Sequence, residues 1–140
     1  MLLAAIAARA DLALGVRKGK GVAPGSIAPA ARFGNWLCGW LIWLGWRRRL
    51  HDLSPLKAVR VEALQRLELH ELTYGFTVEL LALAVARRFV IAEVTVGYRM
   101  RPGGISKVSG DFRASVKAGY RILWTIGRVA RREGVRIGNR

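Results

Sequence analysis

Two acidic side chains stand where a carboxylate could do chemistry. Asp52 lies between the tri-arginine run 47–49 and a Ser-Pro turn at 54–55. Beside an acceptor oxygen its carboxylate would be a general base, whereas pairing with an arginine or capping the turn would make it structural. Glu79 lies in an otherwise apolar segment, where an unpaired carboxylate is costly to bury. Glu79 therefore either pairs with an arginine or lines a substrate pocket.

Basic residues and glycines gather in two segments whose composition suits phosphate binding. Residues 17–29 read RKGKGVAPGSIAP and are predicted to form a loop. Arg17 in this segment and Arg32 just beyond it could each hold phosphate oxygens through two parallel hydrogen bonds, although a solvated loop has the same composition. A second basic, glycine-rich loop is predicted at 99–110, with Arg99, Arg101 and Lys107.

No arrangement of metal ligands is visible in the sequence. The two histidines, one cysteine and three widely separated aspartates form no group at ligand spacing, so we expect this chain to bind no metal. GxGxxG, P-loop and HExxH motifs are absent. His51 and Asp52 are adjacent, but neighbouring side chains of an extended segment point to opposite sides, so we predict no catalytic pair there.

The charge of the chain indicates an anionic partner. Lys and Arg number 24 against 9 Asp and Glu, a net charge of +15, and the pI is about 11.6. A hydrophobic content of 52% excludes a disordered basic tail, because such tails lack apolar surface to bury. Cys38 is alone, which excludes an intrachain disulfide. The lone cysteine favours an intracellular location. No basic residue precedes the opening apolar stretch, so we expect no signal peptide.

The hydrophobic pattern predicts alternating helices and strands in an α/β domain with a parallel or mixed sheet. About three strands are expected, fewer than the five or six of a usual sheet, so the domain looks incomplete. Helices are predicted at 2–10, 33–46, 61–67, 73–88 and from Asp111 onward, and strands at 11–16, 56–60 and 89–98.

Two of the predicted helices could lie at a membrane surface. Residues 33–46 are apolar and contain four tryptophans, but a bilayer-spanning helix needs about 20 residues. This segment is therefore either a core helix or an interfacial one. The C-terminal helix is basic and amphipathic, typical of a membrane-surface helix or of a packed helix with a solvated basic face. We expect one face to carry Phe112, Val116, Gly119, Tyr120, Leu123, Ile126 and Ala130, and another to carry Arg113, Lys117, Arg121, Arg128 and Arg132.

Four segments in order resemble the later half of family 2 glycosyltransferases, in particular the bacterial branch related to dolichyl- and polyprenyl-phosphate sugar transferases. They are ADLALGVR at 10–17, DLSPLKAV at 52–59, YGFTVE at 74–79 and YRMRPGGISKVSG at 98–110. The resemblance runs from about Leu2 to Val129.

The resemblance implies a GT-A, Rossmann-like fold, of which 1–110 would be the acceptor-side half and 111–140 a basic amphipathic helix and tail. By motif position, Asp52 would be the catalytic or acceptor-orienting carboxylate. Substrate would be bound by Arg17, Arg32, Glu79, Arg99, Arg101 and Lys107. The complete family enzyme uses Mg²⁺ or Mn²⁺ to neutralise the leaving nucleoside diphosphate.

The Asp-x-Asp motif that holds this metal in the family is absent from the sequence. Met1 also falls inside a helix expected before the first strand. We therefore expect a fragment that transfers no sugar unless the nucleotide-binding half complements it. Its partner would be an anionic membrane surface or a lipid phosphate, at the inner face of the cell membrane.

Rival functions follow from charge alone. A small basic nucleic-acid-binding protein would show the same net charge, but no RRM, KH, helix-turn-helix or zinc-finger pattern is present, and we expect no nucleic-acid partner. A non-catalytic protein that binds membrane surfaces is the other alternative.

Overall fold

The computed structural model describes residues 1–72, 75–99 and 112–135, except for the side chains of 112–115. Helices and strands alternate through most of this range, as the sequence predicts. The elements in chain order are α1 (Leu2–Ala7), β1 (Leu12–Val22), α2 (Pro29–Trp46), β2 (Lys57–Val59), α3 (Val61–Leu67), α4 (Phe76–Ala86), β3 (Ile91–Tyr98) and α5 (Phe112–Glu133).

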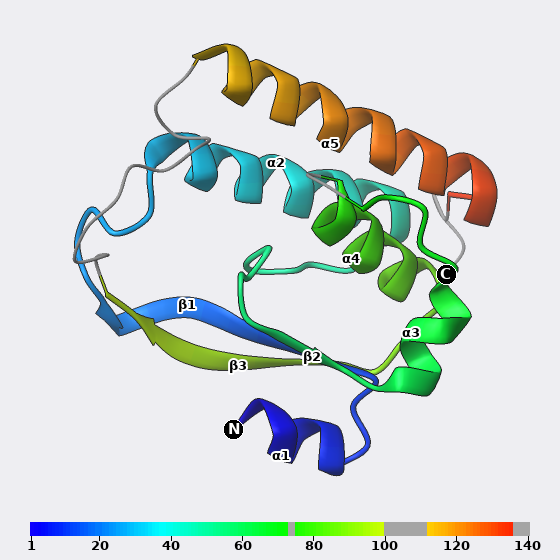
Figure 1. Ribbon diagram of the computed structural model, residues 1–140, viewed down its shortest axis with the longest axis horizontal. Helices are drawn as coiled ribbons and strands as arrows, with labels where there is room; N and C mark the ends of the chain where they lie inside the picture. The colour runs from blue at the N-terminus through cyan, green and yellow to red at the C-terminus, as the bar shows by residue number, and fades with distance from the viewer. Residues whose placement is uncertain (73–74, 100–111, 136–140) are drawn as a thin grey trace.

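The sheet is small and mixed, which confirms the predicted α/β class. Its strand order is β2-β1-β3, with β1 parallel to β3 and antiparallel to β2. Helices α2 and α4 lie on one side of the sheet, and α5 lies along them on the side away from the strands (Figure 1). Helix α1 lies on the opposite side of the sheet (Figure 1).

Strand β1 is longer than the sequence predicts. The expected loop over 17–29 is wrong for residues 17–22, which continue the strand beside β3. The pairing shifts register between Arg17 and Val22, where Gly19 adopts a φ of +83° that favours glycine. A Cβ at Gly21 would lie 3.2 Å from the Cα of Gly97, so glycines on both strands allow close approach. The glycines here permit a bulged strand. A glycine-rich composition is equally typical of a loop, so the sequence alone does not distinguish the two.

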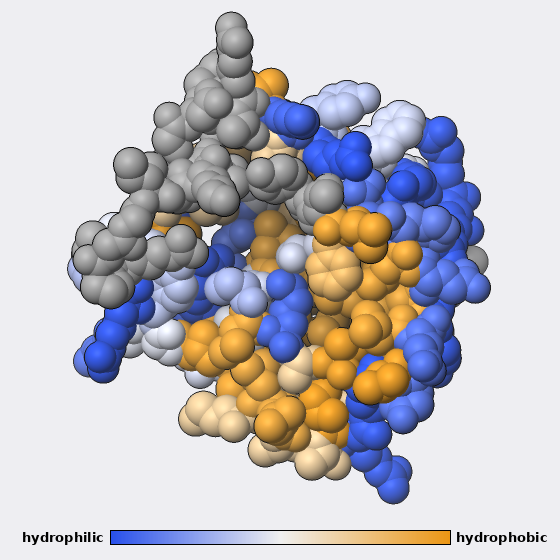
Figure 2. All heavy atoms as spheres, in the orientation of Figure 1, coloured by the Kyte–Doolittle hydropathy of each residue, from blue (hydrophilic) through white to orange (hydrophobic). Residues whose placement is uncertain are grey.

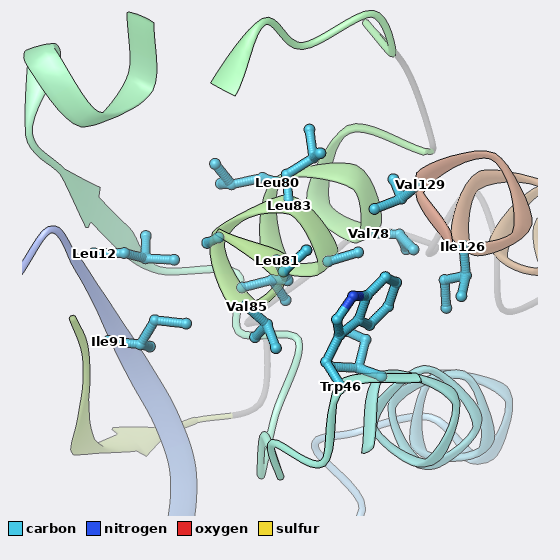
Figure 3. Close-up of a cluster of buried hydrophobic side chains, with 14 of the residues drawn as sticks. Leu12, Trp46, Val78, Leu80, Leu81, Leu83, Val85, Ile91, Ile126 and Val129 are labelled. Carbon is cyan, nitrogen blue, oxygen red and sulfur yellow. The ribbon is translucent and has the colours of Figure 1, made fainter. Parts of the chain in front are cut away.

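Helix α4 is the centre of the hydrophobic core. Every residue from Val78 to Ala86 is buried, as expected for a helix with no polar face. Figure 3 shows its leucines and valines surrounded by Trp46 of α2, Ile126 and Val129 of α5, and side chains of the strands. The core therefore joins the sheet to all three long helices.

Helix α2 begins with Pro29, whose fixed φ suits the first turn, and ends where Arg47 adopts a left-handed conformation. Its buried side includes Cys38, Ile42 and Trp46. Phe33 and Trp36 are more than half exposed, so the helix is neither fully a core helix nor fully on the surface. None of the helices in the described part of the chain has the length and apolar character needed to cross a membrane.

Helix α5 is basic and amphipathic, and only part of its expected apolar row packs in the core. Ile126 and Val129 are buried, together with Thr125. Tyr120 and Leu123, expected on the same face as Ile126, are at least half exposed. The physical reason is that arginines of α5 turn toward buried carboxylates near α4, which rotates the helix away from the purely apolar arrangement.

The space-filling view shows hydrophobic atoms gathered over α4 and, lower down, over α1 (Figure 2). Hydrophilic atoms line the edge near α3 and the C-terminal end of α5 (Figure 2). Hydrophobic and hydrophilic side chains are thus unevenly distributed over this face.

Replacing Leu81 by Ala tests the core around α4. Leu81 is fully buried, so the substitution should lower the free energy of unfolding by about 2–5 kcal/mol. Chemical denaturation followed by circular dichroism would measure the change. Leu72→Ala is the control, because Leu72 is 88% exposed and its truncation should cost less than about 0.5 kcal/mol. Equal effects of the two substitutions would contradict this description of the core.

Candidate functional site

The Asp52 carboxylate is held by groups from two other elements. The Arg17 guanidinium, on β1, donates to both of its oxygens, from Nε and Nη2, each at 2.7 Å. The Asn35 amide, on α2, donates to Oδ1 at 2.7 Å. The Arg17 backbone N–H also donates to Oδ2 at 3.1 Å. The structure therefore brings the predicted residues Arg17 and Asp52 together, and adds Asn35.

Local structure explains how the carboxylate reaches this position. Strand β2 pairs with β1 only at Leu12–Leu14, so further along this edge the Arg17 backbone N–H is available to a side chain. Ser54 anchors the segment that carries Asp52, because its hydroxyl donates to the backbone carbonyl of Gly15 at 2.7 Å. The side chains of Asp52 and Arg17 are only 5% and 9% exposed.

The ion pair changes the acidity of both groups. Burial acts to raise the pKa of Asp52, but the hydrogen bonds and charge of Arg17 outweigh it and hold that pKa below its usual value. The side-chain hydrogen bond to Asp52 raises the pKa of Arg17. Asp52 is thus ionised at neutral pH. Because both of its oxygens already accept hydrogen bonds, the arginine-paired interpretation is favoured over a general base.

A cavity of about 640 Å³ lies beside this ion pair, between α2 and the segment that follows it. Its lining includes three cationic side chains, Arg17, Arg32 and Arg49, so the predicted Arg32 is also at this site. Three tryptophans of α2 form an aromatic wall: Trp36, Trp40 and Trp43.

The cavity is electropositive on the side of its arginines. The charge of Arg17 is balanced by its ion pair with Asp52. Among the described residues, no carboxylate lies within ion-pair distance of Arg32 or Arg49, which also line the cavity. The Arg49 guanidinium lies over the Trp43 ring, 5.5 Å from its centroid. Such a lining can receive an anionic group beside an apolar one.

His51 also lines the cavity, but it pairs with a different carboxylate from its neighbour in sequence. Its backbone N–H donates to Glu93 Oε1 at 2.9 Å, and its ring Nδ1 lies 2.6 Å from Oε2. Glu93 belongs to β3, so this contact ties the cavity to the edge of the sheet. The two histidine contacts agree with the prediction that His51 and Asp52 form no pair.

Glu79 lies apart from this cavity. Its Oε2 accepts hydrogen bonds from the backbone N–H groups of His70 and Glu71, at 2.9 and 2.7 Å. Its Oε1 lies 2.9 Å from Arg128 Nη2 of α5, and its side chain is 2% exposed. The arginine pairing considered from the sequence is therefore observed, and Glu79 does not line the cavity of Asp52.

Of the remaining predicted binding residues, the structure describes only Arg99. Arg99 is exposed directly after β3 and is not among the lining residues. Arg101, Lys107 and Asp111 lie outside the described residues, as does most of the predicted loop 99–110. Substrate-binding roles for Arg99, Arg101 and Lys107 stay predictions.

Sequence reasoning missed Asn35, Arg49 and His51 as members of the site. Arg49 follows the tryptophan-rich segment, and that proximity was the only available signal. The contacts of Asn35 and His51 join residues 17 and 42 positions apart, so no local pattern could reveal them.

The described residues contain no cluster of metal-ligating side chains. Nowhere in 1–72, 75–99 and 112–135 do three or more His, Cys, Asp or Glu side chains come together to hold a metal ion.

The chain is similar to proteins of two mycobacterial species, Mycobacterium bovis and Mycobacterium tuberculosis, that carry the name uncharacterized glycosyltransferase. The identity is 38% over 88 residues, which is 63% of this chain and 40% of each relative. The chain thus spans less than half the length of the relatives it matches. No family model matches the chain, and no solved structure does either. The expected similarity to glycosyltransferases is confirmed at this level.

Asp52→Asn tests the buried ion pair. Removing the charge of one partner leaves the Arg17 guanidinium uncompensated, which should lower the free energy of unfolding at pH 7 by about 3 kcal/mol. Because the folded-state pKa of Asp52 is lowered, the pair stabilises the wild type above about pH 4. The stabilisation is lost as the pH falls through that lowered value.

The difference between wild type and Asp52→Asn should therefore shrink in acid. Urea unfolding at several pH values would measure it. Glu93→Gln is the matched control, because its partner His51 is 56% exposed and the loss should stay within about 1 kcal/mol. A difference that is small at pH 7, or that grows in acid, would contradict the role given to this pair.

Proposed function

We propose that this chain forms the acceptor side of a family 2 glycosyltransferase. The reaction it serves moves a sugar from a nucleotide-sugar to a polyprenyl-phosphate-type or other membrane-associated acceptor. The cavity that combines three arginines with three tryptophans carries this proposal, because it suits a ligand that is anionic at one end and apolar at the other. Similarity to proteins named glycosyltransferases supports the sugar-transfer part.

The proposed ligand is held by two kinds of contact. Arg32 and Arg49 bind the phosphate oxygens with charge-assisted hydrogen bonds. The hydrocarbon chain lies against Trp36 and Trp40, which line the cavity and remain partly exposed at its margin. Because both contacts are needed, a phosphate without a hydrocarbon chain binds more weakly than a prenyl phosphate.

Asp52 acts in this proposal as a positioning residue. Its two oxygens accept hydrogen bonds from Nε and Nη2 of Arg17 and so orient the guanidinium. The Asn35 amide donates to the carboxylate and orients it in turn. A phosphate acceptor needs no strong base, since its second pKa is near 6 and an oxygen is already anionic at neutral pH. The acceptor oxygen attacks the anomeric carbon of the sugar while the nucleoside diphosphate leaves. Arg17 keeps the acceptor phosphate aligned for that attack.

Donor binding belongs to a part that this chain does not provide. The sequence has no Asp-x-Asp motif, and the match covers 40% of each relative. The Mg²⁺ or Mn²⁺ of the complete enzyme would bind together with the donor. In this proposal the side chains of this chain do not serve as ligands to that metal. The isolated chain is accordingly inactive until complemented.

The location proposed with this function is the inner face of the cell membrane, as a peripheral protein. A membrane-associated acceptor requires such a position. A net charge of +15 favours attraction to an anionic leaflet.

Binding of farnesyl phosphate to the purified chain tests the acceptor site. Arg49→Ala removes a cavity cation and should weaken binding about tenfold or more, measured by tryptophan fluorescence. Arg48→Ala is the matched control from the same arginine run, because Arg48 does not line the cavity and should leave the affinity within about twofold. Equal binding of farnesol, or equal effects of the two substitutions, would exclude a phosphate site here.

A sugar-transfer assay tests the missing donor half. The purified chain, given a set of nucleotide-sugars, Mn²⁺ and a prenyl phosphate, should release no nucleoside diphosphate above the rate without protein. Robust turnover by the chain alone would contradict the proposal that donor binding lies elsewhere. Chromatography of the lipid fraction would identify any product.

A further inference from the structure

The two longest helices expose apolar side chains, most of which lie outside the proposed acceptor cavity. On α2, exposed side chains recur at intervals of three or four residues: Phe33, Trp36, Trp40 and Leu44. On α5, a second exposed row consists of Val116, Tyr120, Leu123 and Trp124. Exposed fractions reach 61% at Trp36 and 63% at Tyr120. An apolar surface of this extent calls for a partner.

The two rows belong to neighbouring helices. Helix α5 lies along α2 on the side away from the sheet (Figure 1), and a Cβ on Gly34 would lie 3.8 Å from Ile122 Cδ1. Within the α2 row the aromatic rings are continuous, with centroids 5.8 Å apart from Phe33 to Trp36 and 6.3 Å from Trp36 to Trp40. We call these eight side chains the α2–α5 surface.

Arginines lie over tryptophans at and beside this surface. The guanidiniums of Arg47 and Arg49 lie 4.9 and 5.5 Å from the centroid of Trp43. Arg131 lies 5.9 Å from the centroid of Trp124. Tryptophan beside arginine is typical of the headgroup level of a bilayer, where an apolar body and a cation are both satisfied.

We propose that the α2–α5 surface docks on an anionic lipid bilayer, with its aromatic side chains at headgroup depth. Charge complementarity favours a bilayer over a second copy of the chain. A second copy would bring two molecules of net charge +15 together, whereas anionic headgroups neutralise the surrounding arginines. The helices lie in the interface without crossing it.

Docking in this orientation connects the bilayer to the cavity. Trp36 and Trp40 belong both to the α2–α5 surface and to the cavity wall, so the cavity margin faces the lipid. A lipid phosphate then enters sideways from the bilayer, with its hydrocarbon chain along the tryptophans and its phosphate toward Arg49. This part rests on the proposed function, but vesicle docking and prenyl-phosphate binding are separate measurements, and either can fail alone.

Sedimentation with vesicles tests the proposal on the full chain. Vesicles of phosphatidylcholine with about one-quarter phosphatidylglycerol should bind the wild type and shift its tryptophan emission to the blue, and phosphatidylcholine alone should bind it at least about tenfold more weakly. The double variant Phe33→Glu/Leu123→Glu should lower the partition coefficient at least about tenfold, since both side chains leave the interface.

The matched control is Leu3→Glu/Val61→Glu. Leu3 is 78% and Val61 63% exposed, so the control adds the same charge at apolar side chains of α1 and α3, which contribute no residue to the α2–α5 surface. It should bind vesicles within about twofold of the wild type, because it lies outside the docking surface. Circular dichroism would verify that both variants keep their helices.

Two results would overturn the proposal. Equal losses in the two double variants would show that added negative charge, and not the α2–α5 surface, controls binding. A wild type that forms dimers, ignores anionic vesicles and becomes monomeric in Phe33→Glu/Leu123→Glu would show that the surface binds a second copy. Light scattering after size-exclusion chromatography would reveal that outcome.

Discussion

The paired hydrogen bonds between the Arg17 guanidinium and the Asp52 carboxylate join parts of the chain that are far apart in sequence. Arg17 belongs to the central strand, and Asp52 to the segment that leaves α2, while Asn35 ties the same carboxylate to α2 itself. One charged contact thus fixes the distance between the sheet and the helix that walls the cavity. Both side chains are nearly buried, so water screens their charges weakly. The hydrogen bonds between them therefore define the relative positions of Arg17 and Asp52. This contact therefore helps to set the shape of the cavity.

The order of helices and strands was accessible from the sequence because each element has a distinct local pattern. Residues 78–86 are apolar on every side apart from Glu79, and 91–98 are rich in β-branched residues. The length of β1 was not accessible, because its second half is glycine-rich and is held as a strand by β3. The sequence also left open which residues of α5 pack in the core. Periodicity identifies an amphipathic helix, but the tertiary partners of Arg121 and Arg128 decide how it is rotated.

The candidate site was predicted in part. Arg17, Arg32 and Asp52 do meet at one cavity, and Arg17 and Asp52 came from motifs that resemble a known family. Glu79 came from a motif too, yet it faces α5, because a motif fixes a residue's place in the chain and not the direction of its side chain. Asn35 and His51 depend on partners distant in sequence, so only the three-dimensional arrangement reveals them.

The two buried glutamates at and near α4 predict which positions should vary together among homologous chains. Glu71 and Glu79 are neutralised by Arg121 and Arg128, which reach them from a helix some fifty positions away in sequence. Loss of either arginine leaves a buried glutamate with fewer cationic partners, because the side chains of Glu71 and Glu79 are only 4% and 2% exposed. Homologous chains should therefore gain or lose the four together, and such covariation would mark the attachment of the last helix in sequences that share little else.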